Sequence, residues 1–162
     1  MNFKKDDKVL KLVKYIGKNY DVQSQVMMQK LLYFLSLDFY KETNHLLFGN
    51  YFQAWVYGPV QPKAFSALKK HGFDFDDEFW VALDEIKSVK LKRFIDTDIK
   101  KYLEFDLYEL SELSHKTSPW IKARHGLAHD QIALRWINKD EFKKYAKSNN
   151  YNQLQKVSFS VH

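Results

Sequence analysis

Two histidines in the stretch HGLAH have the spacing of a metal site on a helix. His125 and His129 stand four residues apart, so a helix would place both imidazoles on one face. However, Gly126 is a poor helix residue, and no glutamate stands between the histidines as a zinc protease requires. We therefore expect exposed loop histidines and no metal site.

A second group of residues combines hydroxyls with an imidazole. Ser114, His115 and Ser118 carry the groups that a nucleophile and its base require. Adjacent helical residues point in different directions, however, and no G-x-S-x-G motif frames a nucleophile. We instead expect Ser118 to cap a helix and His115 to bind backbone in the preceding turn.

Phosphate-binding and thiol chemistry are also missing from the sequence. Neither G-x-x-x-x-G-K-[ST] nor G-x-G-x-x-G occurs, and the five glycines are scattered. The absence of cysteine excludes disulfides and thiolate ligands and is typical of a reducing compartment. We therefore expect no catalytic residue, no cofactor and no enzyme activity.

The composition is that of one globular domain. The chain has 162 residues, of which 45% are hydrophobic and 28% charged, enough for a single core. Its aromatic content of 17% predicts a core rich in Phe and Tyr. The N-terminus lacks the apolar segment of a signal peptide, and the apolar run 26–40 is too short for a membrane span. We expect a cytoplasmic domain over residues 1–162 with no membrane contact.

The net charge of +6 raises the question of nucleic acid as a partner. Only three of the 26 basic residues are arginine, the residue that base and phosphate recognition favours. We therefore interpret the net charge as compositional bias rather than as a nucleic-acid-binding surface. A nucleic-acid-binding regulator stays open as an alternative; it would use the lysine face of the first helix, Lys8, Lys11, Lys14 and Lys18.

The elements that position these groups are mostly helical. Apolar residues at helical spacing predict a first helix over about 6–20, with Asp6 or Asp7 as N-cap. A second helix, from about Ser24 to Glu42, is apolar almost all round and should be central to the domain. Further helices are predicted over 62–71, 84–103 and 107–115, from Ser118 onward, and from Asn138 or Asp140 to Lys147.

Short extended segments are predicted between these helices. Residues 46–48 and 51–57 flank Gly49–Asn50 and predict a small β-hairpin, and residues 132–137 are a further strand candidate. The polar residues 149–162 are expected to form a frayed tail. The fold class is thus mainly α, a single compact helical domain of about six helices with a small β-hairpin.

The stretch QAWVYGPVQP, residues 53–62, predicts a stiff aromatic corner. Trp55 and Tyr57 share one face of an extended strand. Gly58–Pro59 is expected to end that strand, because proline cannot donate to a ladder, and Pro62 to start the next helix.

Three segments resemble a known family when taken in order. They are MQKLLYF at 28–34, then LF at 47–48 with FQAWVYGPV at 52–60, then LYELS at 107–111 with His115 and SPW at 118–120. Together they resemble the Panacea antitoxin domain, also called SocA-like and described in phage-associated proteins of the GepA type. The resemblance covers roughly residues 8–145.

This resemblance implies a small helical antitoxin that neutralises a toxin encoded by a neighbouring gene through direct protein–protein binding. The family is paired with many unrelated toxins. One member instead acts as a proteolytic adaptor that delivers its toxin to an ATP-dependent protease, which is a second partner to consider. An exposed aromatic patch could equally serve a homodimer.

We expect the partner-binding residues to lie in the recognised motifs. They are Gln29, Lys30 and Tyr33, on an exposed edge of the second helix, with Trp55, Tyr57, Gly58 and Pro59 in the corner. Aromatic residues on a rigid junction are typical interface anchors. The motifs could instead serve folding alone, with the partner surface elsewhere.

Overall fold

The computed structural model describes residues 7–49 and 51–159. Its helices are α1 (Lys8–Asn19), α2 (Gln25–Thr43), α3 (Pro62–His71), α4 (Glu78–Ala82), α5 (Val89–Asp98), α6 (Lys100–Leu103), α7 (Leu107–His115), α8 (Ser118–Ala123), α9 (Lys139–Ala146) and α10 (Asn149–Phe159). The strands β1 (Gln53–Trp55) and β2 (Gly58–Val60) form one antiparallel pair. The predicted fold class, mainly α with a small hairpin, is confirmed.

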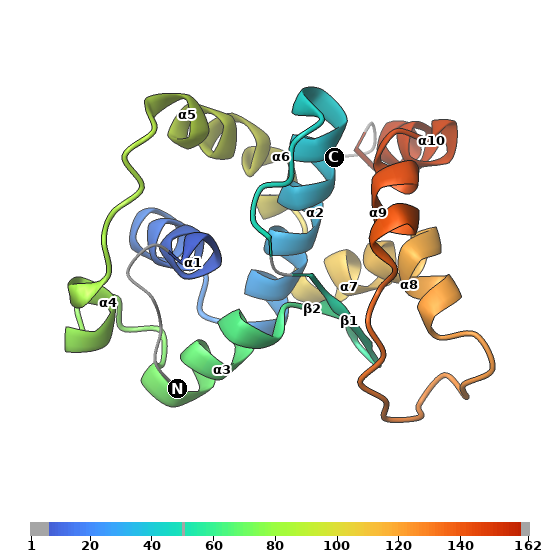
Figure 1. Ribbon diagram of the computed structural model, residues 1–162, viewed down its shortest axis with the longest axis horizontal. Coiled ribbons are helices and arrows are strands. Elements are labelled where there is room, and N and C mark those ends of the chain that lie inside the picture. Colours follow the sequence, from blue (N-terminus) through green and yellow to red (C-terminus); the bar gives the residue numbers. More distant parts are fainter. Residues whose placement is uncertain (1–6, 50, 160–162) are drawn as a thin grey trace.

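Helix α2 is the centre of the molecule. It starts where the Ser24 side chain accepts a hydrogen bond from the Met27 N–H, and it ends at Asn44, which has a positive φ. Helices α1, α3, α5, α7 and α9 and strand β2 lie around it (Figure 1). All residues from Met28 to Asp38 are buried, which explains why the sequence is apolar on nearly every side of this helix.

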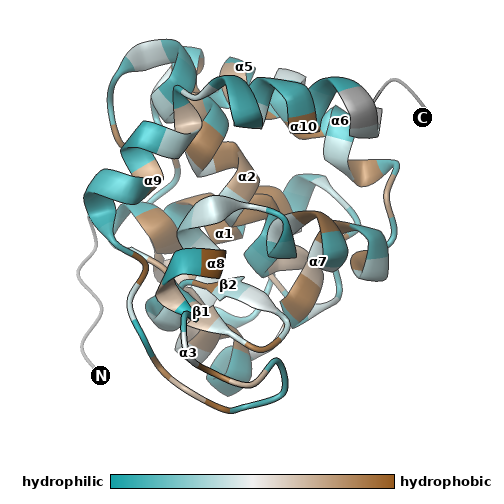
Figure 2. Cartoon of the chain, turned by 90° about the vertical axis from the view of Figure 1, so that its right-hand side faces the viewer, coloured by the Kyte–Doolittle hydropathy of each residue, from teal (hydrophilic) through white to brown (hydrophobic). Residues whose placement is uncertain are grey.

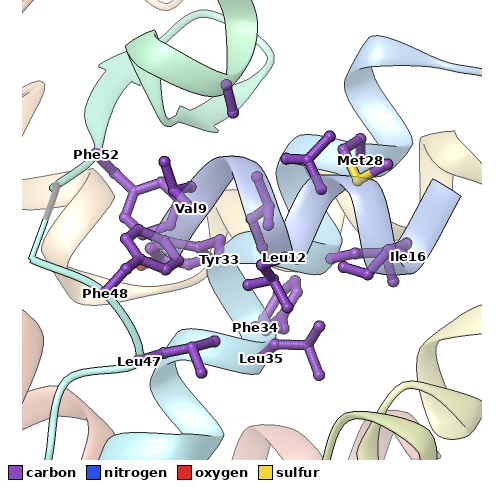
Figure 3. Close-up of a cluster of buried hydrophobic side chains, with 14 of the residues drawn as sticks. Val9, Leu12, Ile16, Met28, Tyr33, Phe34, Leu35, Leu47, Phe48 and Phe52 are labelled. Atoms are coloured by element: carbon purple, nitrogen blue, oxygen red, sulfur yellow. The ribbon is translucent and has the colours of Figure 1, made fainter. Parts of the chain in front are cut away.

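The core is rich in aromatic rings, as the composition predicted. Tyr33 makes edge contacts with Phe34, Phe52 and Phe142, and Phe34 stacks on Tyr102 at 5.1 Å between ring centroids. Figure 3 shows α1, α2 and the segment before β1 meeting in one cluster; the labelled side chains are Val9, Leu12, Ile16, Met28, Tyr33, Phe34, Leu35, Leu47, Phe48 and Phe52.

The predicted hairpin turn at Gly49–Asn50 is wrong, and Asn50 itself lies outside the described residues. The turn is Val56–Tyr57, between β1 and β2. Pro59 does not end a strand but lies within β2, opposite Ala54. The Ala54 N–H points the other way and donates to the Arg135 carbonyl at 2.8 Å. A proline is tolerated here because this position of the ladder needs no N–H donor.

Two expected boundaries are shifted. The helix predicted over 84–103 begins only at Val89, capped by the Ser88 hydroxyl, and is divided into α5 and α6. Thr117, not Ser118, occupies the N-cap position of α8. Its hydroxyl caps no N–H, because it donates to the Ser114 carbonyl instead.

The strand predicted over 132–137 is reduced to one bridge between Gln53 and Trp136. The lysine face expected on α1 is also partly wrong. Lys14 is buried, donates to the Leu83 carbonyl at 2.6 Å and lies 3.0 Å from the Glu85 carboxylate. Asp7 occupies the N-cap position of α1, but its carboxylate pairs with Lys63 at 2.6 Å and caps no N–H. Asp6 lies outside the described residues.

The frayed tail predicted from residue 149 is also wrong, although residues 160–162 lie outside the described ranges. Helix α10 docks on α2 through Tyr151, which is fully buried and donates to the Asp38 carboxylate. Gln155, one turn further on, donates to the same carboxylate at 3.0 Å. Two polar side chains that look solvent-exposed in the sequence thus bind a buried acid 113 and 117 residues away.

The acid that holds α10 belongs to a larger buried cluster. Asp38 also accepts a hydrogen bond from Tyr102 and lies 3.2 Å from Lys101, which pairs with Asp98 at 3.1 Å. Burial, together with the neighbouring Asp38 carboxylate, raises the pKa of Asp98 to about 9. The cluster joins α2, α5, α6 and α10.

No helix within residues 7–49 and 51–159 combines the length and the apolar character that crossing a bilayer requires.

Removing the Tyr151 hydroxyl should loosen α10. Tyr151→Phe leaves the buried Asp38 carboxylate with one donor fewer, so we expect the free energy of unfolding to fall by about 1–3 kcal/mol in urea titrations. Tyr145→Phe removes a hydroxyl from another buried tyrosine outside this cluster and should cost clearly less. Equal losses for the two variants would contradict the assigned role of Asp38.

Candidate partner-binding site at the hairpin corner

The residues predicted to bind a partner separate into one exposed and several buried positions. Tyr57, at the turn between β1 and β2, is 71% exposed. Trp55 is half-buried, and Gly58 and Pro59 are buried. The remaining predicted residues, Gln29, Lys30 and Tyr33, are at most 1% exposed.

The prediction that Gln29, Lys30 and Tyr33 form an exposed edge of α2 is therefore wrong. Strand β2 and the residues after it cover this face of α2: the side-chain Oε1 of Gln29 accepts from the Gln61 backbone N–H at 2.7 Å. Tyr33 lies one turn further along and shares a 2.8 Å hydrogen bond with the Thr117 hydroxyl. Whether any of the predicted residues touches a partner stays a prediction.

Lys30 connects α2 to β2. Its Nζ donates to the Pro59 carbonyl at 2.8 Å, and no carboxylate pairs with it within residues 7–49 and 51–159. Burial removes the hydration of the ammonium and lowers the pKa of Lys30 to about 7. Lys30 is therefore a buried residue that links α2 to β2 through a hydrogen bond, and its charge is costly to bury. It is not a surface cation available to a partner.

Gly58 allows the hairpin to lie directly on this lysine. Its φ is +116°, which side chains rarely adopt, and a Cβ there would lie 2.5 Å from Ser114 Oγ and 2.6 Å from Lys30 Cε. The glycine is required both by the turn and by the close approach of α2 and α7.

The third recognised segment holds the other side of the turn. The Ser111 hydroxyl donates to the Tyr57 carbonyl at 2.6 Å, and the Trp120 indole N–H donates to the Trp55 carbonyl at 2.8 Å. Ser114, the nucleophile considered from the sequence, is fully buried and donates to the Ser111 carbonyl. This arrangement positions backbone and supports no nucleophilic chemistry at Ser114.

His115 contributes to the same wall. Its ring stacks on Trp120 at 4.3 Å between centroids. Burial lowers the pKa of His115, although Glu112, at 3.7 Å, acts in the opposite direction. His115 thus favours its neutral form and packs as an aromatic ring beside the indole.

Arg124 is the fourth side chain that donates to a hairpin carbonyl, and the sequence analysis did not identify it. Its buried guanidinium donates to the Ala54 carbonyl at 2.9 Å and to the Gln131 carbonyl at 2.7 Å. Side chains from α2, α7, α8 and the residue after α8 thus bind four hairpin carbonyls. We call these four bonds the carbonyl anchors: Lys30–Pro59, Ser111–Tyr57, Trp120–Trp55 and Arg124–Ala54.

An apolar surface lies beside the anchored hairpin. The loop after α8 passes the hairpin and carries several hydrophobic stretches (Figure 2). Three of its large hydrophobic side chains are exposed, namely Ile132 by 86%, Leu134 by 63% and Trp136 by 60%. Ile132 and Leu134 line a hollow of about 470 Å³ together with Trp55, Tyr57 and other apolar groups. The alternation in IALRW was the sequence signal for this surface, but it was interpreted only as a strand.

The two histidines with metal-site spacing lie in the same loop. His125 and His129 are exposed, as predicted, and Gly126 between them has a φ of +83°. The backbone here is a turn and not the helix that would align the two imidazoles. Within the described ranges, no group of three or more His, Asp or Glu side chains could hold a metal ion.

The comparison with protein families decides the assignment. The model of the SocA-like antitoxin, Panacea domain, matches residues 28–121. The chain belongs to this antitoxin family. Searches of curated proteins and of solved structures found no match.

The Panacea match covers three of the four carbonyl anchors and ends before the loop after α8. It includes Lys30, Ser111 and Trp120 with the carbonyls that they bind, and it ends at Ile121. Family membership implies a protein partner and favours a role other than catalysis. The exposed residues of the loop after α8 lie beyond the matched segment.

The lowered pKa of Lys30 predicts a specific pH dependence of stability. Between about pH 7 and 10.5 the unfolded chain holds the Lys30 proton and the folded chain does not, so stability should rise with pH, by at most about 1.4 kcal/mol per pH unit. Lys30→Met should abolish this rise in urea titrations at pH 7, 8 and 9. Lys8→Met, at an exposed position of α1, should retain it; a rise unchanged in Lys30→Met would contradict the assignment.

Gly58 should not tolerate a methyl group. Gly58→Ala should lower the free energy of unfolding by about 1–3 kcal/mol, because of the positive φ and the overlap with Ser114 and Lys30. Gly49→Ala is the matched control: an added Cβ there would have no neighbour within 4 Å, so little change is expected. Thermal or urea unfolding of both variants gives the comparison.

Proposed function

We propose that this protein is the antitoxin of a toxin–antitoxin pair and that it neutralises a toxin encoded by a neighbouring gene through direct protein binding. Membership of the SocA-like antitoxin family supports the role.

The proposed contact surface is the exposed side of the hairpin corner together with Ile132, Leu134 and Trp136. The observation that carries this choice is Tyr57, which is 71% exposed although the Ser111 hydroxyl fixes its carbonyl. An exposed aromatic ring on a fixed backbone binds at a low entropic cost, and tyrosine and tryptophan are frequent interface anchors.

In this proposal the buried motif residues support the surface and do not touch the toxin. Gln29, Lys30 and Tyr33 are all inaccessible, and each bonds to a segment packed against α2. Substituting them should affect binding through the position of the hairpin. Their role in the family is then to present a rigid corner.

The nucleic-acid alternative has less support than the protein partner. Lys14, one of the four α1 lysines it requires, is buried against Leu83 and Glu85. Lys18 also lies within 3.8 Å of the Glu85 carboxylate. The phosphate-binding stripe predicted along α1 is therefore interrupted at Lys14.

Co-expression with the product of each neighbouring reading frame tests the proposal. One product should be toxic alone, be rescued by this chain and co-purify with it. Tyr57→Ala should weaken the purified complex about tenfold or more, since buried interface tyrosines often contribute over 1.4 kcal/mol. Val89→Ala, at a residue 65% exposed on α5, should bind as the wild type does.

The other outcomes separate the alternatives. Rescue with disappearance of the toxin, reversed when the ATP-dependent proteases are deleted, would identify a proteolytic adaptor. If no neighbouring product is toxic or none is rescued, the antitoxin proposal fails. Titration of duplex DNA at several salt concentrations then tests the regulator.

A further inference from the structure

The end of the segment 132–136 runs beside β1 and is paired on one side only. The Arg135 carbonyl accepts from the Ala54 N–H, and the Ile137 N–H donates to the Phe52 carbonyl, both at 2.8 Å. These two bonds enclose the bridge between Gln53 and Trp136. The segment is thus an irregular third strand beside β1.

The backbone groups of the intervening residues face away from β1. In an extended chain, N–H and C=O groups alternate between the two sides, so those of Leu134 and Trp136 point opposite to those of Arg135 and Ile137. Among the residues that the structure describes, no backbone hydrogen bond joins Leu134 or Trp136 to another segment. We call this side of residues 132–136 the open edge.

The open edge contains neither lysine nor proline. Proteins protect exposed edges with lysine, proline, bulges or a covering element. Here Ile132, Leu134 and Trp136 are 60–86% exposed and alternate with Ala133 and Arg135. The adjoining hollow of about 470 Å³ is almost entirely apolar. Such an edge suits a partner strand that carries apolar side chains at alternate positions.

Arg135 places a positive charge within the open edge. Lys122, in the same stretch of the chain, is already paired with Glu141 at 2.7 Å. The Arg124 and Arg135 guanidinium groups donate to backbone carbonyls, and within the described ranges neither forms an ion pair with a carboxylate. Charge complementarity therefore favours an acidic residue beside the apolar positions of the partner strand.

We propose that the toxin adds one extended strand, apolar at alternate positions and flanked by an acidic residue, to the open edge of residues 132–136. This inference rests on the proposed antitoxin function and specifies how the partner is bound. Main-chain hydrogen bonds to Leu134 and Trp136 hold the strand in register, and the exposed side chains of the edge select its apolar residues.

Amide hydrogen exchange on the free chain and on its purified complex with the rescued neighbouring gene product tests the binding mode. In the free chain, the amides of Leu134 and Trp136 should exchange fast, whereas those of Ala54 and Ile137 should be protected. In the complex, the Leu134 and Trp136 amides should slow by about tenfold or more. Partner docking by side chains alone would leave this alternating pattern unchanged.

A backbone substitution provides the second test. Leu134→Pro removes one outward N–H and keeps an apolar residue in an extended conformation, so the complex should weaken about tenfold or more. Leu134→Val keeps the N–H with a similar loss of side-chain volume and should bind nearly as the wild type does. If Leu134→Pro does not fold, the exchange experiment on the wild-type chain decides.

Three outcomes overturn the inference, and they differ in whether they also contradict the proposed antitoxin function. A stable complex without protection at Leu134 and Trp136, or equal binding by Leu134→Pro and Leu134→Val, removes strand addition and leaves the antitoxin function standing. Failure to form any complex with the neighbouring products removes both. A free chain that is dimeric in light scattering, with these amides already protected, assigns the open edge to a second copy of this chain.

Discussion

The bond between the Lys30 ammonium and the Pro59 carbonyl determines how the hairpin lies on α2. Pro59 pairs with Ala54 at a ladder position without hydrogen bonds, so its carbonyl points away from β1 and toward the helix. A buried carbonyl without a donor costs about 1–3 kcal/mol, and the long lysine stem brings a donor to it. The same burial lowers the pKa of Lys30. At higher pH the side chain is neutral, so no unpaired charge is buried.

The other three carbonyl anchors extend this principle around the hairpin. Two three-residue strands do not form a stable sheet on their own. Donors from Ser111, Trp120 and Arg124 therefore add side-chain bonds to the hairpin carbonyls of Tyr57, Trp55 and Ala54. The hairpin is therefore held by side chains that come from positions up to 70 residues away in the sequence.

The sequence predicted those parts of the fold that local signals control. Ser24 and Pro62 mark the starts of α2 and α3, and both helices lie within a residue or so of the predicted ranges. The hairpin turn was misplaced because Gly49–Asn50 has the stronger local preference, whereas the observed turn depends on bonds from Lys30 and Ser111. The burial of α10 was missed because its bonds to Asp38 also join residues that are far apart in the sequence, 113 and 117 positions.

In the candidate site, too, some features follow from neighbouring residues in the sequence and others depend on long-range contacts. That Tyr57 is an exposed aromatic at a stiff corner could be expected from its neighbours in the sequence. The burial of Gln29, Lys30 and Tyr33 could not, because polar side chains at helical spacing look the same whether water or a hairpin carbonyl receives their hydrogen bonds. Only the three-dimensional structure supplies the partners at Pro59, Gln61 and Thr117.

The same division indicates which residues can change without loss of the fold. The matched family segment, residues 28–121, contains Lys30, Ser111 and Trp120, whose substitution would disturb the hairpin backbone. Ile132, Leu134 and Trp136 follow that segment and are exposed, and surface substitutions usually change stability by no more than about 0.5 kcal/mol. These exposed residues can therefore diverge without loss of the fold, while the carbonyl anchors keep the hairpin backbone in one place.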